Sequence, residues 1–124
     1  MKTNIMEYIA EERKLQGITA TEFAARLPFS RQRTESLIAA GDAPFKHARL
    51  MLNALGKDVD ILTKEGNLPD FINTAEDREN LFASIADSRI YFCKLEKIIE
   101  LMGYTFEIAD IQAADSAPGE KKEQ

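Results

Sequence analysis

The chain has 124 residues, a formal net charge of −5 at pH 7, 44% hydrophobic residues and 30% charged residues, which excludes a disordered chain. This length predicts one compact domain, or two very small units that share a core. No apolar run approaches the ~20 residues of a membrane span. The first residues lead into an acidic segment rather than a secretory signal. The single cysteine, Cys93, cannot form an internal disulfide. We therefore expect a cytoplasmic protein.

The first half of the chain predicts four helices. Apolar residues on one side of residues 4–15 indicate the first helix, and Thr19 with Glu22 forms a capping box for a short second one that ends at Pro28. Ser30 is a good N-cap for a third helix that ends near Gly41. The fourth helix is expected to carry Pro44 in its first turn and to run to Leu55, with Gly56 as its cap.

The second half predicts two strands and two helices. Polar and apolar residues alternate in 57–62 and again in 104–108, as in strands. A turn at 64–69, a helix from 74 to about 87 and another over about 91–102 separate them. The expected fold is therefore mainly α, a helix-turn-helix bundle followed by a helical hairpin with one or two short strands. We divide it into a unit at 1–62, a hairpin plus strand at 63–112, and a disordered tail at 113–124.

A weak internal similarity links the two halves. A shift of 47 residues places Ala54-Leu55-Gly56 on Leu101-Met102-Gly103. The same shift pairs residues 59 and 61 with 106 and 108, Arg31 with Arg78, and Ile38-Ala39 with Ile85-Ala86. A degenerate repeat and a chance likeness between two helical hairpins both explain this pattern.

Charge is distributed unevenly along the chain. Residues 57–124 carry eight basic and fifteen acidic side chains, whereas residues 23–49 carry five basic and two acidic ones. The five are Arg26, Arg31, Arg33, Lys46 and Arg49. A locally basic segment of an acidic protein is typical of a DNA-binding surface, although any solvated pair of helices can have this composition.

Residues 9–56 resemble the Cro/phage-repressor (XRE-type) helix-turn-helix family. The matching text includes Gly17-Ile-Thr-Ala-Thr-Glu-Phe-Ala24, Leu27-Pro-Phe-Ser30-Arg-Gln-Arg33 and Leu52-Asn-Ala-Leu-Gly56. The resemblance implies a DNA-binding regulator, typically a dimeric repressor of prokaryotic or phage type. An antitoxin that represses its own operon is a close variant.

The residue types also fit this function. Phe23 and Ala24 should face the next helix, Phe29 should anchor the turn, and Thr34 and Leu37 should point inward. Arginine and glutamine match guanine and adenine edges, and other polar side chains hold phosphates. The candidate DNA-binding residues are Thr21, Ser30, Arg31, Gln32, Arg33, Glu35, Ser36 and Lys46, with Thr21, Arg33 and Lys46 as phosphate contacts.

Departures from the family pattern keep a second function open. Ala20 stands where the family often has a phosphate-binding glutamine, Pro28 where a turn glycine is common, and Ile38-Ala39-Ala40 where Glu-Asn-Gly is usual. The last change removes the expected partner of Arg13. The alternative is a protein-binding adaptor on a degenerate helix-turn-helix scaffold, docking through its acidic second half.

Catalysis is not expected. His47 is the single histidine, which excludes a multi-histidine metal site, and Cys93 reads as a small core or interface residue rather than a nucleophile. We expect no enzyme activity, no cofactor and no metal. The expected partners are double-stranded DNA and a second copy of the chain, with the two strand segments paired within one chain or across a two-fold axis.

Overall fold

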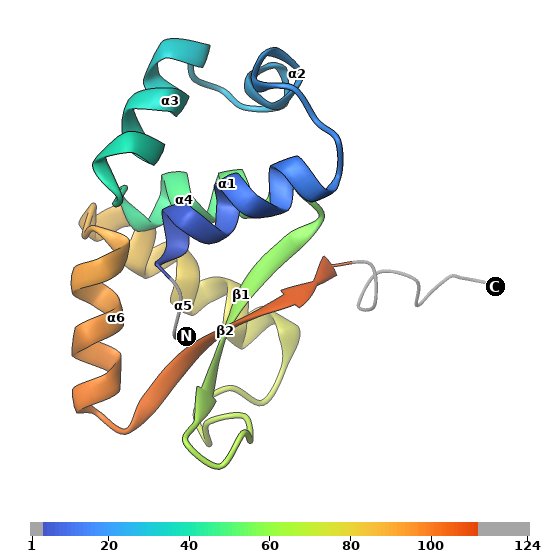
Figure 1. Cartoon of the computed structure of the whole chain (residues 1–124). Helices are drawn as coiled ribbons and strands as arrows, with labels where there is room; N and C mark the ends of the chain where they lie inside the picture. Colours follow the sequence, from blue (N-terminus) through green and yellow to red (C-terminus); the bar gives the residue numbers. More distant parts are fainter. Residues whose placement is uncertain (1–3, 112–124) are drawn as a thin grey trace, which may run out of the picture.

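The computed structural model describes residues 4–111, which form six helices and two strands (Figure 1). In chain order the elements are α1 (Ile5–Leu15), α2 (Ala20–Ala25), α3 (Arg31–Ala40), α4 (Phe45–Ala54), β1 (Lys57–Thr63), α5 (Ala75–Ser88), α6 (Phe92–Leu101) and β2 (Tyr104–Asp110). The prediction of a mainly α fold with two short strands is therefore confirmed. The predicted tail at 113–124 lies outside the described residues.

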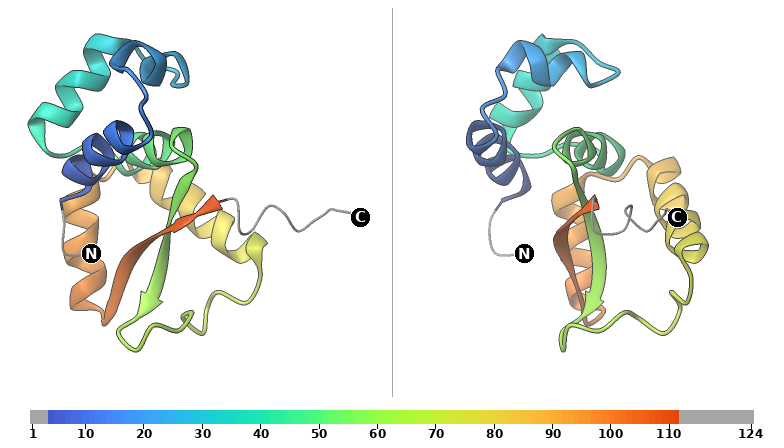
Figure 2. Two further views of the ribbon diagram at one scale, coloured as in Figure 1. Left: turned by 45° about the vertical axis from the view of Figure 1, so that its right-hand side comes forward. Right: turned by 90° about the vertical axis from the view of Figure 1, so that its right-hand side faces the viewer.

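Figures 1 and 2 show α2 and α3 together at one end of the molecule, with the sheet and α6 toward the other end and α1 and α4 between them. Helices α1, α2 and α3 begin at polar side chains that accept hydrogen bonds from otherwise unpaired amides. The Asn4 side chain accepts from the amides of Met6 and Glu7 at the start of α1. The predicted caps of α2 and α3, Thr19 and Ser30, are both present.

The sequence predicted that Pro44 lies in the first turn of α4, and this is wrong. Pro44 is the extended residue just before the helix. It forms an isolated antiparallel bridge with Tyr91. The Phe45 amide donates to the Ile90 carbonyl and the Phe92 amide donates to the Ala43 carbonyl, both at 2.8 Å. This bridge joins the starts of α4 and α6, and it explains why Pro44 keeps an extended backbone.

The two strands pair with each other within the chain, in an antiparallel ladder that runs from Lys57 opposite Asp110 to Thr63 opposite Tyr104. This answers the open question of the strand partners in favour of intrachain pairing. Val59, Ile61 and Phe106 are buried, so one face of the ribbon joins the core.

An approximate two-fold axis relates the segment from α4 to β1 with the segment from α6 to β2. All four boundaries of the second helix and strand lie 47 residues after those of the first. Gly56 and Gly103 link the helix to the strand in each segment, and both have a left-handed backbone that favours glycine. Asp60 faces Glu107 in the ladder and Pro44 faces Tyr91 in the bridge, so equivalent residues meet at both contacts. Antiparallel pairing between equivalent residues is what a two-fold axis produces.

The repeat extends to α3 and α5, but in a register of 48 residues rather than 47. Each helix ends at a left-handed residue, Gly41 in α3 and Arg89 in α5. With this register the buried Thr34 corresponds to the buried Phe82, and Leu37 to Ile85. The sequence-based pairings of Arg31 with Arg78 and of Ile38 with Ile85 are therefore shifted by one residue. The reason is that the connection from α5 to α6 is one residue shorter than the connection from α3 to α4.

The core is built around four phenylalanines, Phe45, Phe82, Phe92 and Phe106. The ring centroid of Phe45 lies 5.5 Å from that of Phe82, 5.9 Å from that of Phe92 and 5.8 Å from that of Phe106. One hydrophobic cluster contains these rings together with Ile5, Phe23 and Leu37 from the N-terminal helices. Residues on both sides of the predicted boundary at 62 therefore share one core.

Candidate nucleic-acid interface

Helices α2 and α3 pack against each other, and each begins at the N-cap residue that the sequence predicted. Phe23 and Ala24 of α2 are buried, as are Thr34 and Leu37 of α3. The buried Thr34 hydroxyl donates to the Ser30 carbonyl at 2.9 Å, so its polar atom is satisfied inside the core. The Ser30 hydroxyl accepts from the Arg33 amide at 3.1 Å, which fixes the start of α3. The first turn of α3 is thus held with its other side chains outward.

All eight residues predicted to bind DNA are exposed. The set is Thr21, Ser30, Arg31, Gln32, Arg33, Glu35, Ser36 and Lys46. They come from the start of α2, the first two turns of α3 and the start of α4; Figure 1 draws α2 and α3 uppermost and α4 below them.

The fold brings residues of this set together at two places. The Arg31 guanidinium donates to the Thr21 hydroxyl at 3.4 Å, which joins the starts of α3 and α2. On the other side, Arg33 and Lys46 flank His47, whose ring packs edge-on against Phe29 with centroids 5.0 Å apart. Burial lowers the pKa of His47, and the positive charges of Arg33 and Lys46 lower it further.

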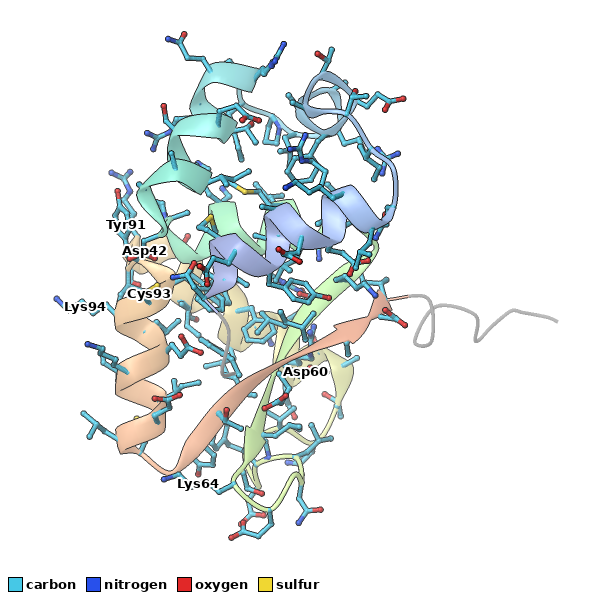
Figure 3. All side chains as sticks on the ribbon, viewed as in Figure 1. Asp42, Asp60, Lys64, Tyr91, Cys93 and Lys94 are labelled. Atoms are coloured by element: carbon cyan, nitrogen blue, oxygen red, sulfur yellow. The ribbon has the colours of Figure 1, made fainter. Side chains whose placement is uncertain are left out.

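The cations of this surface are not neutralised by nearby carboxylates. Among residues 4–111, Arg31, Arg33 and Lys46 form no ion pair. Glu35 is the one acidic residue of α3. Asp42 is directed elsewhere, since its carboxylate accepts from the Ala43 and Cys93 amides, and Figure 3 shows it beside Cys93.

Two arginines of the basic segment serve other purposes. Arg26 donates to the Ala54 carbonyl at 3.0 Å, and Arg49 forms ion pairs with Asp58 and Glu79. The basic surface is therefore smaller than the sequence count of five suggested. His47 is the residue that sequence reasoning left out of the site, although its place next to Lys46 at the start of α4 was a usable signal.

The expected loss of a partner for Arg13 has a visible result. Its Nε atom is buried and has no hydrogen-bond partner among the described residues. Arg13 belongs to α1 and is not one of the eight residues predicted to bind DNA.

Groups with catalytic potential are few. No cluster of three or more His, Cys, Asp or Glu side chains within residues 4–111 is placed to hold a metal ion. Burial raises the pKa of the Cys93 thiol to about 11, and Asp42 adds to the effect through a hydrogen bond and its charge. The thiol therefore stays protonated at neutral pH and is a poor nucleophile.

Comparison of the chain with known protein families, with curated proteins and with solved structures finds no match. None of the helices in the described part of the chain combines the length and the apolar character needed to cross a membrane.

Proposed function

We propose that this protein is a sequence-specific DNA-binding regulator of the helix-turn-helix type, with α3 as its recognition helix. The observation that carries the proposal is the capped start of α3, where Arg31 and Gln32 are exposed beside cations that have no carboxylate partner among residues 4–111. An arginine and a glutamine on the first turn of such a helix are suited to guanine and adenine edges in the major groove.

The surrounding residues have distinct roles in this proposal. Glu35 and Ser36, one turn further along α3, contact the next base pairs, and Ser30 fixes the helix start whose amides face the DNA. Thr21, Arg33 and Lys46 contact phosphates and orient the helix without reading sequence. The resemblance to phage repressors supports a repressor in the cytoplasm, with an autorepressing antitoxin as a variant.

A single chain offers one recognition helix, because the symmetry-related helix α5 is acidic. Glu76, Asp77, Glu79 and Asp87 lie on α5, and its Arg78 is tied to Asp58, Asp60 and Glu79. An operator with two half-sites therefore requires two copies, and we keep the homodimer as part of the proposal. Since β1 and β2 pair with each other, the dimer must use another surface than these paired edges.

The test is selection from a random double-stranded DNA library, followed by affinity measurements on the selected duplex at several salt concentrations. Arg31→Ala or Gln32→Ala should lose about 1–3 kcal/mol of specific binding. Lys46→Ala should weaken specific and non-specific binding equally and should reduce the salt slope by about one. Lys64→Ala is the matched control, since Figure 3 places Lys64 at the far end of β1.

Unchanged affinity of Arg31→Ala at matched salt would overturn the assignment of α3 as the recognition helix. Failure to bind any duplex at low salt would favour the second candidate, a protein-binding adaptor. That candidate is supported by the exposed apolar side chains of α6 and by the acidic sequence, with a pI of about 4.9.

A further inference from the structure

Helix α6 and the residue that caps its C-terminus expose three large apolar side chains on one side. Ile98, Leu101 and Met102 are 39%, 89% and 65% exposed. They are spaced three and four residues apart and are therefore neighbours on the helix surface. We call these three residues the α6 stripe. The helix lies at an outer edge of the molecule in Figure 1 and in the left view of Figure 2.

The two-fold axis identifies the counterpart of the α6 stripe on α4, which is covered. The residues 47 positions earlier are Met51, Ala54 and Leu55, of which Met51 is 0% and Leu55 3% exposed. Helix α1 packs against α4 and buries its own Ile5, Met6 and Ile9 in the same core cluster. The equivalent face of α4 thus receives an amphipathic helix.

The second half of the repeat lacks such a helix. Residues 64–74, which come between β1 and α5, contain turns and bends but no helix. No described element therefore repeats for α6 what α1 does for α4. Exposed apolar groups of this size are costly to leave in water unless something covers them.

Charge on the two helices points to the kind of cover. Lys94 and Lys97 lie beside the α6 stripe, and within residues 4–111 neither forms an ion pair. Figure 3 shows Lys94 directed outward from the helix. Glu100 is the exposed acidic residue on this part of α6. Helix α1, which covers the equivalent face, carries the half-buried Glu12 beside its apolar side, with Glu7 and Glu11 exposed on its outer side and Arg13 and Lys14 in its last turn.

We propose that the α6 stripe is a docking site for an acidic amphipathic helix of a partner protein, which lies on α6 as α1 lies on α4. Apolar residues of the partner helix cover Leu101 and Met102, and its carboxylates face Lys94 and Lys97. A second copy fits this site less well. Its α1 is already buried against its own α4, and two α6 faces in contact would bring four lysines together with only the two exposed Glu100 carboxylates.

The probe is a fluorescein-labelled peptide of residues 4–16 with blocked ends, which is the helix that covers the equivalent face and carries three acidic and two basic side chains. The peptide is titrated with the full-length chain, and binding is followed by fluorescence anisotropy. A helix this short is marginal in water, so we expect weak binding, with a Kd on the order of 100 μM. A peptide with Lys at positions 7, 11 and 12 should bind at least about tenfold more weakly.

Substitutions on the protein locate the site. Leu101→Glu and Met102→Glu should each weaken binding about tenfold or more, and both residues are exposed enough for the fold to persist, which circular dichroism checks. Lys94→Glu combined with Lys97→Glu should weaken binding and remove its salt dependence. Leu68→Glu is the control, because Leu68 is also an exposed apolar residue but lies before α5.

Three results would overturn the proposal. The first is no binding of the peptide up to about 1 mM chain. The second is binding that Leu101→Glu leaves unchanged, which would mean that the peptide displaces α1 from α4. The third is a dimer in light scattering that Leu101→Glu dissociates, which would identify a second copy as the occupant. The proposal is independent of DNA binding, since Arg31→Ala should leave peptide affinity unchanged.

Discussion

At the scale of single residues, Phe82 is the centre of a charged network that holds α5 on the sheet. The guanidinium carbons of Arg49 and Arg78 lie 4.7 Å and 4.6 Å from the centroid of its ring. Both arginines also form ion pairs with Asp58, at 3.0 Å and 3.1 Å. The arrangement joins α4, β1 and α5 through cation–π contacts and paired charges, and Asp58 is the carboxylate shared by both arginines.

We predict that Asp58→Asn makes the protein less stable and less sensitive to acid. Burial alone would raise the pKa of Asp58, but its hydrogen bond to Arg49 and the charges of both arginines lower it. A carboxylate whose pKa is lower in the folded state stabilises the protein above its unfolded pKa, and this contribution is lost as the pH falls through the folded value. Urea denaturation should show a loss of about 2–3 kcal/mol at neutral pH.

The same series, extended from about pH 5 to about pH 3, should show a shallower decline for Asp58→Asn than for the unsubstituted chain. Asp70→Asn is the control, since Asp70 is exposed and is not part of this network. Equal slopes for Asp58→Asn and the unsubstituted chain would contradict the role given to the network.

At the scale of elements, the sequence predicted the helix starts, because these depend on residues that are close together in the chain. Thr19 with Glu22 and Thr74 with Asp77 form capping boxes, and Ser30 caps α3, so these helices begin where the local sequence indicated. Local signals do not report what a side chain meets after folding. The hydrogen bonds from Arg26 to the Ala54 carbonyl and from the Cys93 amide to the Asp42 carboxylate span 28 and 51 residues, and they decide which charges remain free on the candidate interface.

The packing of α2 on α3 leads to a test by truncation of one side chain. Phe23→Ala should cost about 3–5 kcal/mol, because Phe23 is fully buried and its removal leaves a cavity between these helices and the core. Thermal melting followed by circular dichroism measures the loss. Leu15→Ala, an exposed site on α1, should change stability by no more than about 0.5 kcal/mol. Unaltered melting of Phe23→Ala would mean that the helix pair is not packed in this way.

At the scale of the whole molecule, the two-fold arrangement makes each half depend on the other. Phe45 packs on Phe82, Phe92 and Phe106, all of which come from the second half. β1 likewise has β2 as its partner strand. The sequence shift of 47 residues suggested the repeat, but only the pairing of Asp60 with Glu107 and of Pro44 with Tyr91 placed the two copies face to face.

We predict that a chain cut after residue 69 does not fold cooperatively. The cut removes three of the four core phenylalanines and leaves the backbone of β1 unpaired. Far-ultraviolet circular dichroism during heating should show a broad, shallow change in place of a sigmoidal transition. A sharp transition in the shortened chain would show that residues 1–62 are an independent unit, as the sequence-based division has it.

The long separation of the paired strands also has a consequence during synthesis. β1 begins at Lys57 and β2 at Tyr104, so 47 residues must be added before the partner strand is made. At about 5–20 residues per second, β1 waits about 2–9 s on the ribosome as an open edge. Lys57, Asp58 and Asp60 place charges along this strand, and charged edges resist pairing with other chains. Asp58 and Asp60, which later bind Arg78 of α5, therefore also protect the nascent chain from aggregation while it waits.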